Sequence, residues 1–131
     1  MIGLDTNVVI RILVDDDPIQ SGAVKKLLAA HDNTVGAFFV NDIVLAESAW
    51  VLASAYRQSR EAIAAAIQAL LDTPAFAVEN TGAVAQALKH FKTTNADFSD
   101  CLLVARNAAR HCVQTVTFDR KMQELPSVKL L

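Results

Sequence analysis

The chain has 131 residues, the length of a single domain, and about two thirds of its unfolded surface should be buried on folding. Hydrophobic residues make up 53% of it, and no apolar run approaches the roughly 18 to 20 residues that a membrane span needs. The N-terminus lacks the basic and apolar stretches of a signal peptide, so we expect one soluble cytoplasmic domain over residues 1–131. The formal net charge of -2 argues against a protein that coats nucleic acid.

The first predicted elements follow from hydrophobic spacing and from helix-capping residues. Residues 2–4 form a short apolar run consistent with a buried strand, and helical spacing follows it. Asp17, which precedes a proline, predicts the start of a helix that runs to about Ala30. Residues 36–40 predict the next strand, and Asn41 is placed to cap a long helix.

The second half of the chain continues this alternation, starting with Ser59, which is placed to cap an alanine-rich helix. The further predicted elements are a strand at 76–78, a helix from Gly82 to about Phe91, a helix from about Asp97 to His111, a strand at 114–118, a short helix from about Arg120 to Leu125 and an extended segment at 128–131. Strands that alternate with helices predict the α/β class, with three layers and a central parallel sheet covered on both faces.

Two carboxylates follow predicted strands. Asp5 comes after the first apolar run, and Asp119 comes after the strand at 114–118. In open α/β sheets, ligands bind outside the carboxyl ends of the strands, so we expect both acids at the same edge of one sheet. Each also has a plain structural interpretation as the cap of the helix that follows it.

Three more acids fall on predicted helices. Glu47 shares a helix face with apolar neighbours such as Ile43 and Trp50, where an isolated carboxylate needs a cation, a proton or a route to solvent. Asp97 and Asp100 lie three residues apart at the start of another helix. Asp97 is interpreted as a helix cap, whereas Asp100 lies inside the first turn and can point into the crevice.

Taken together, these acids favour the binding of a hard cation. Mg²⁺ and Mn²⁺ prefer carboxylate oxygens and water as ligands. The sequence contains no phosphate-binding loop, no dinucleotide-binding glycine motif and no serine-hydrolase elbow, and its three histidines lack zinc-site spacing. Cys101 and Cys112 lie too far apart along one predicted helix to form a disulfide, and we expect both thiols to be buried.

Four segments, taken in order, resemble the motifs of the PIN domain family, and within it the VapC-like toxins of type II toxin–antitoxin pairs. IGLDTNVVI resembles the first motif, a strand that ends in Asp-Thr-Asn, and NDIVLAESAWVL resembles the second, a glutamate inside an apolar helix. NADFSDCLLVARNA resembles the third, and TVTFDRKM the fourth, an apolar strand that ends in Thr-x-Asp. The similarity extends over almost the whole length.

The resemblance implies a hydrolase, a metal-dependent endoribonuclease that uses Mg²⁺ or Mn²⁺. By this match the catalytic and metal-binding acids are Asp5, Glu47, Asp100 and Asp119, with Asp97 as a further ligand or support. Thr6 and Asn7 would line the site, and Thr117 would hydrogen-bond to a carboxylate or its water. One or two metal ions, about 3.5 to 4 Å apart if two, would activate water for attack on a phosphodiester.

The resemblance also implies partners: an RNA substrate, a cognate antitoxin protein and a second copy in a homodimer, with no membrane. Among the basic residues, we expect Arg11 and Arg120 to lie nearest the site and to contact RNA. Exposed apolar helix surface around Trp50, Leu52 and Tyr56 would suit a dimer or antitoxin contact, although core packing is the commoner fate of such residues.

Two other classes of function are weighed against the ribonuclease. A non-catalytic PIN-like interaction module would be expected to lack one or more of the acids, and all are present. A phosphoaspartate receiver or a phosphatase also gathers acids at strand ends. The receiver needs paired acids close after its first strand, and the phosphatase needs a second aspartate two residues after the first, where this chain has Asn7.

Overall fold

The computed structural model describes all residues from Met1 to Leu131 and has the α/β fold predicted from the sequence. The elements run in the order β1 (Ile2–Gly3), α1 (Thr6–Leu13), α2 (Pro18–Ala30), β2 (Phe38–Val40), α3 (Asp42–Ser54), α4 (Arg60–Asp72), β3 (Phe76–Val78), α5 (Thr81–Thr93), α6 (Phe98–Ala109), β4 (Thr115–Thr117), the 3₁₀ helix η1 (Arg120–Glu124) and β5 (Val128–Leu130). Parallel strands are flanked by helices, as the alternation of the two element types predicts.

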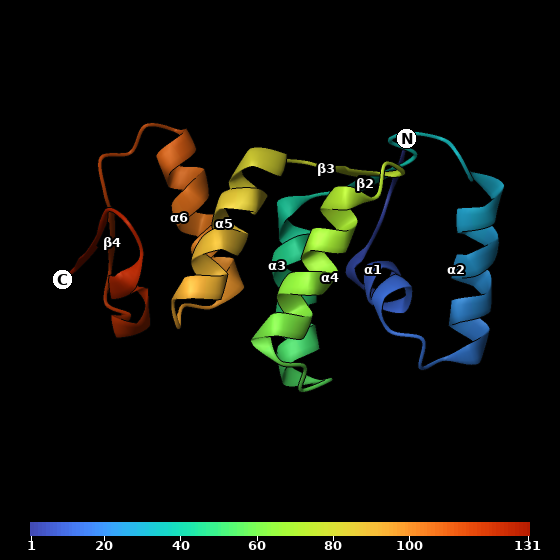
Figure 1. Cartoon of the computed structure of the whole chain (residues 1–131), viewed down its shortest axis with the longest axis horizontal. Coiled ribbons are helices and arrows are strands. Elements are labelled where there is room, and N and C mark those ends of the chain that lie inside the picture. Colours follow the sequence, from blue (N-terminus) through green and yellow to red (C-terminus); the bar gives the residue numbers. More distant parts are fainter.

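The strands form two separate sheets, and this differs from the single central sheet expected. One sheet has the order β1-β2-β3, with Ile2 opposite Phe38 and Phe38 opposite Phe76. The other consists of β4 and β5, with Thr115 opposite Val128. Figure 1 shows that helices α3 to α6 stand between the two sheets, so that β4 and the C-terminus lie at the opposite end of the molecule from α1 and α2.

Three of the predicted helix caps are confirmed by hydrogen bonds. The side chains of Asp17, Asn41 and Ser59 each accept a hydrogen bond from a backbone N–H in the first turn of the helix that follows. These bonds satisfy donors that a helix start leaves without intrahelical partners. Local chemistry therefore determines where α2, α3 and α4 begin.

The apolar core is one continuous cluster of 27 buried residues, and the helices contribute most of them. Leu45 and Leu52 of α3, Ile67 of α4 and Leu88 of α5 are almost fully buried in it. Leu52 is therefore core rather than contact surface. The cluster extends through the layer of helices that separates the two sheets, and this packing holds the sheets apart.

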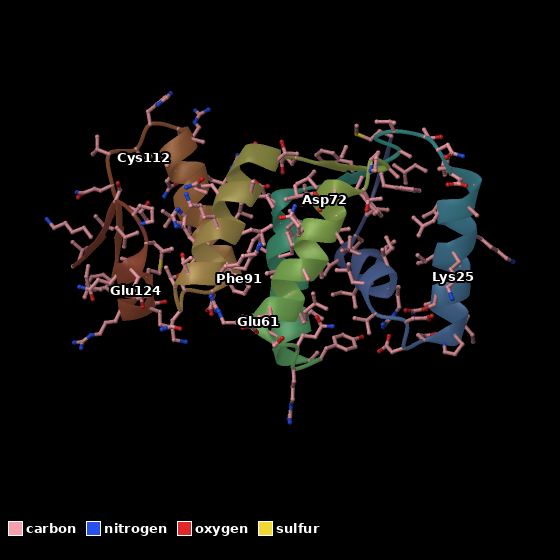
Figure 2. All side chains as sticks on the ribbon, viewed as in Figure 1. Lys25, Glu61, Asp72, Phe91, Cys112 and Glu124 are labelled. Carbon is pink, nitrogen blue, oxygen red and sulfur yellow. The ribbon has the colours of Figure 1, made fainter.

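Arg60 joins the start of α4 to the turn between α5 and α6. Its Nη2 atom donates hydrogen bonds to the carbonyl oxygens of Phe91, Thr94 and Ala96 at 2.7, 3.0 and 2.7 Å. The guanidinium also lies 3.9 Å from the centre of the Phe91 ring, a cation–π contact. Phe91 is on the side of α5 that faces α4 (Figure 2).

The two cysteines differ in environment. Cys101 lies buried in α6, and burial raises the pKa of its thiol to about 11. Cys112 is exposed in the connection after α6 (Figure 2), because that helix ends at Ala109 and the following chain leaves the core. The expectation of two buried thiols is therefore wrong for Cys112. No helix of the structure is long and apolar enough to cross a membrane.

We predict that Arg60→Lys lowers the free energy of unfolding by about 1 to 3 kcal/mol, because an ammonium cannot reproduce several charge-assisted hydrogen bonds to carbonyls and the planar contact with Phe91. Urea unfolding followed by circular dichroism measures the change. Arg57→Lys is the matched control, since Arg57 is exposed, and it should change stability by less than about 0.5 kcal/mol. Equal effects of the two substitutions would contradict a stabilising role for these Arg60 contacts.

Candidate functional site

Asp5 occupies the helix-start position of α1 without capping the helix. Its backbone carbonyl accepts hydrogen bonds from Val8 and Val9, but its side chain makes no capping bond and is exposed. The carboxylate of an aspartate at this position normally accepts hydrogen bonds from the N–H groups of the first turn. The structure thus leaves the Asp5 carboxylate free to bind something else at the end of β1.

Glu47 is held beside this position by Thr6. The buried Thr6 hydroxyl donates a hydrogen bond of 2.6 Å to Oε2 of Glu47, and this bond joins α1 to α3. Asp5 and Glu47 form the first group of acids, here called the α1–α3 acids. The bond from Thr6 restricts which way the Glu47 carboxylate points.

Glu47 is exposed rather than buried on an apolar stripe. Its helix neighbours Ile43 and Trp50 are each 69% exposed, so this face of α3 points to solvent. The conflict expected from a buried, unpaired glutamate therefore does not arise. The core face of α3 is formed instead by residues such as Val44 and Leu45.

A second group of acids, here called the α6 acids, consists of Asp97, Asp100 and Asp119. Asp97 lies at the helix-start position of α6, yet its side chain makes no capping hydrogen bond. Asp100 lies half-buried in the first turn. Asp119 does cap the helix that follows it, since its Oδ1 accepts a 2.9 Å hydrogen bond from the Lys121 N–H.

Thr117 acts on the backbone of Asp119. Its hydroxyl accepts a 2.9 Å hydrogen bond from the N–H of Asp119 and donates to the sulfur of Met122 at 3.4 Å. Together with the bond from Lys121, this contact orders the segment after β4 and positions the Asp119 side chain. Thr117 therefore supports the acid indirectly.

Electrostatic repulsion links the α6 acids. Burial raises the pKa of Asp100 above its ordinary value, and the negative charges of Asp97 and Asp119 raise it further. The positive charge of Lys121 opposes this shift. A cation bound beside these oxygens would relieve the repulsion, which is the donor chemistry that Mg²⁺ and Mn²⁺ prefer.

The two groups of acids include residues that follow strands of different sheets. Asp5 follows β1 and Asp119 follows β4, but these strands belong to different sheets, so the expectation that both acids lie at the edge of one sheet is wrong. No three carboxylate, imidazole or thiol groups lie together in a way that would hold a metal ion. The oxygen donors thus fit a hard cation in kind, but a single chain does not assemble a complete donor set.

The two arginines singled out from the sequence have different surroundings. Arg11 is already engaged by Asp16 in an ion pair and donates hydrogen bonds to the Gln20 side chain at 2.7 Å and to the Tyr56 hydroxyl at 2.9 Å. Binding RNA would require Arg11 to leave these partners. Arg120 is exposed and makes no side-chain hydrogen bond or ion pair, which leaves it free to contact phosphate.

Sequence reasoning missed an ion pair that attaches α6 to α3. Arg106 Nε lies 3.1 Å from Oδ2 of Asp42, and Asn80 donates a 3.0 Å hydrogen bond to the same oxygen. Glu79 accepts a 2.9 Å hydrogen bond from the Asp42 N–H. No local pattern could have revealed this set, because its members are brought together only by tertiary packing.

A cavity of about 330 Å³ opens beside Asp97, between α3, α4 and the start of α6. Trp50 and Phe98 contribute aromatic surface to its wall, and Arg60 and Ser99 contribute polar groups. An exposed aromatic ring beside polar side chains is the combination on which unpaired nucleobases stack. Asn7 is exposed in the first turn of α1, two residues after Asp5.

Comparison with known proteins gives one match. The family model described as PIN domain matches residues 2–128. No curated protein and no solved structure matches this chain.

We predict that Asp100→Asn stabilises the metal-free protein at neutral pH. A carboxyl whose pKa is raised on folding favours the folded state at acid pH, and this contribution is lost as the pH rises through the raised pKa. The gain at pH 7 should stay below about 1 kcal/mol because the group is only partly buried, and it should vanish near pH 3. Urea unfolding at both pH values, with Asp32→Asn as the exposed control, measures it. A destabilised Asp100→Asn protein at pH 7 would contradict the repulsion.

Proposed function

Because the chain belongs to the PIN domain family, whose members are generally metal-dependent nucleases, we propose that it is an Mg²⁺- or Mn²⁺-dependent endoribonuclease. We further propose that it acts in the cytoplasm as the toxin of a toxin–antitoxin pair, with a cognate antitoxin as its protein partner. One observation carries the proposal. Asp5 and Asp97 occupy helix-start positions, yet neither carboxylate accepts a capping hydrogen bond from the helix that follows. A capping hydrogen bond therefore does not account for aspartate at these positions.

The proposed ligands are all hard oxygen donors on separate elements. Asp5 directly precedes α1 and Glu47 lies in α3. Asp100 lies in the first turn of α6, and Asp119 follows β4. A divalent ion held by such donors would supply Lewis acidity and lower the pKa of its bound water. Asp97 is proposed as a ligand or as a support for Asp100.

The remaining residues of the site are proposed to orient these donors. Thr6 holds Glu47 by its hydroxyl, and Thr117 holds the backbone of Asp119. Asn7 is exposed next to Asp5 in sequence, where an amide can bind the substrate. Each of these contacts limits rotation of an acid before substrate arrives, and such preorganisation lowers the cost of assembling the site.

RNA is proposed to approach along the second half of the chain. Residues 81–131 carry seven Lys and Arg residues against four Asp and Glu residues, although the whole chain is acidic. Arg120 and Lys121 lie directly after Asp119 and can meet the phosphate backbone. Trp50, at the cavity beside Asp97, is placed to stack on an unpaired base.

One observation favours a second candidate function, a non-catalytic PIN-like module that binds protein. The exposed apolar side chains of Ile43 and Trp50 on α3, and of Val113 and Phe118 near β4, resemble the surfaces of interaction sites. The two functions are compatible, because a toxin must also bind its antitoxin. The presence of every acid of the four motifs favours the nuclease.

We predict that the purified protein, freed of any co-purifying partner, cuts RNA at discrete positions with Mn²⁺ and does not cut it with EDTA. Asp5→Asn should lower the rate by roughly a hundredfold or more, since it removes a proposed metal ligand. Incubation with total RNA followed by mapping of the new ends measures both effects. Asp32→Asn, which removes an exposed acid far from the motifs, is the control and should cleave as well as the wild type.

Metal binding provides a second readout that does not depend on cleavage. Mn²⁺ should raise the melting temperature of the wild type, and Asp100→Asn should reduce this shift, because a ligand that binds only the folded state stabilises it. Intact metal binding without cleavage of any RNA would favour the interaction module. Equal cleavage with EDTA would overturn the metal-dependent mechanism.

A further inference from the structure

The connection between α1 and α2 carries three consecutive aspartates, and each has different partners. Asp15 forms an ion pair with Lys25 at 3.2 Å, on the open surface. Asp17 caps α2 with its side chain. Asp16 takes part in neither contact. An exposed lysine and a helix cap thus account for two of the three acids, and the third needs a separate explanation.

The carboxylate of Asp16 is held by two donors from different elements. Nη1 of Arg11, in α1, forms an ion pair with Oδ1 of Asp16. The hydroxyl of Tyr56, which lies just after the end of α3, donates a 2.9 Å hydrogen bond to Oδ2. The same Nη1 of Arg11 donates a 2.9 Å hydrogen bond to the Tyr56 hydroxyl. Both oxygens of one carboxylate are therefore bound by two donors that lie in contact, here called the Arg11–Tyr56 pair.

The Arg11–Tyr56 pair is held in place by contacts that do not involve Asp16. Gln20 accepts a 2.7 Å hydrogen bond from Nε of Arg11, which fixes the plane of the guanidinium. The side chain of Arg11 is only 20% exposed, whereas that of Asp16 is 43% exposed. Removal of the carboxylate would thus leave two preorganised donors facing solvent, and preorganisation lowers the cost of binding a ligand.

These donors suit a phosphate group as well as a carboxylate. A guanidinium recognises both anions through pairs of neighbouring oxygens, and tyrosine hydroxyls are common donors to nucleic-acid phosphates. Asp16 therefore occupies the position, and carries the charge, of a phosphate bound to the same pair.

The pair is also attached to the helix that follows Asp5. Arg11 lies four residues after Asn7, so the two share one face of α1. At a rise of 1.5 Å per residue, Arg11 is about 9 Å along the helix axis from Asp5. A strand that contacts Asp5 and Asn7 can therefore bring another of its phosphates to Arg11.

The segment that carries Asp16 is held mainly by its side chains. The backbone groups of Asp15 and Asp16 make no backbone hydrogen bond between the end of α1 and the start of α2 (Figure 1). A stretch with few backbone hydrogen bonds opens at low cost in free energy. An incoming anion can therefore displace Asp16 while Arg11 keeps its bonds to Gln20 and Tyr56.

We propose that the Arg11–Tyr56 pair is a subsite for a phosphate group of the RNA backbone, and that Asp16 closes this subsite until RNA displaces it. The step exchanges one anion for another at the same donors and makes or breaks no covalent bond. A free phosphate must displace Asp16 unaided, whereas a strand bound elsewhere on the protein presents its phosphate at high effective concentration. The choice of RNA as ligand rests on the proposed function, and the anion subsite does not.

RNA binding by Asp16→Asn tests the proposal without any cleavage. The substitution removes the charge that competes for Arg11 and keeps an oxygen that can accept from Tyr56. Fluorescence anisotropy of a labelled single-stranded RNA, measured in EDTA, should show binding that is about two- to fivefold tighter, the range set by a partly exposed ion pair. One additional phosphate contact should also steepen the slope of log K against log salt concentration by about 0.7.

Asp15→Asn is the matched control. It removes the same charge one residue away and leaves Arg11 bound to Asp16. It should tighten RNA binding less than Asp16→Asn does and leave the salt slope unchanged, because screened long-range attraction is all that it changes. Equal gains in affinity and equal slopes for the two variants would overturn the subsite.

Substitution of Arg11 shows whether the gain arises at the proposed donors. Arg11→Gln combined with Asp16→Asn should bind RNA no more tightly than Arg11→Gln alone. A gain that persists without Arg11 would overturn the assignment. Arg11→Gln by itself needs no change at Asp16, and it should weaken RNA binding and flatten the salt slope by about 0.7. An unchanged slope in this variant would overturn the subsite even if Asp16→Asn fails to fold.

Thermal unfolding separates the subsite from a purely structural ion pair and from a site for free phosphate. A lower melting temperature of Asp16→Asn with no gain in RNA affinity would make the contact structural and overturn the proposal. Inorganic phosphate, compared with chloride at equal ionic strength, is the second probe. A rise in the melting temperature of Asp16→Asn with phosphate, again with no gain for RNA, would assign the subsite to free phosphate and overturn its role for RNA.

Cleavage assays distinguish failure of the subsite from failure of the proposed function. For an active enzyme, Asp16→Asn should lower KM and leave kcat unchanged, because the phosphate contact is present in both the ground state and the transition state. Cleavage by the wild type with no change in the affinity of Asp16→Asn would overturn the subsite alone. Tighter RNA binding by Asp16→Asn, with no cleavage by any variant, would overturn the proposed function and leave the subsite standing.

Discussion

The position of α6 depends on the contact between Arg60 and the turn that precedes that helix. One guanidinium nitrogen donates to the backbone carbonyl of Phe91 in the last turn of α5 and to those of Thr94 and Ala96 in this turn, and the same group stacks on the Phe91 ring. The turn leads directly into Asp97, so the Arg60 contact helps to fix the position of Asp97 and of the start of α6. Because α6 in turn leads to β4, the location of the second sheet follows from this contact as well.

The Asp42–Arg106 ion pair adds a second attachment, between α3 and the last turn of α6. With Arg60 at the start of α6 and Arg106 near its end, the helix is fixed at both ends to the layer formed by α3, α4 and α5. The packing of these helices buries most of the apolar core. This explains how short strands of two or three residues can lie in separate sheets without loss of the overall core.

The acids can be divided by what the fold does with them. Asp17 and Asp119 use their carboxylates to cap helices, and this role accounts for them structurally. Asp5 and Asp97 occupy equivalent positions and do not cap, while Asp100 is held where neighbouring charges and burial raise its pKa. A carboxyl whose pKa is raised by burial and by neighbouring negative charges is typical of a binding site.

The elements of the fold could be predicted from the sequence because their determinants are local. Caps at Asp17, Asn41 and Ser59 mark helix starts within a few residues, and apolar runs mark β2 and β3. Which strands pair is a nonlocal property, and no local pattern revealed that β4 joins only β5 within the chain. The prediction of one sheet failed for this reason.

The same distinction applies to the candidate site. The sequence identified the acids, but it could not show that Asp5 and Asp119 follow strands of different sheets, because this depends on which strands pair with β4. It placed Glu47 on an apolar helix face without deciding whether that face is buried, since periodicity alone does not reveal that Ile43 and Trp50 point to solvent. The sequence singled out Arg11, but it could not show the hydrogen bond from Arg11 to Tyr56, because Tyr56 lies 45 residues away along the chain.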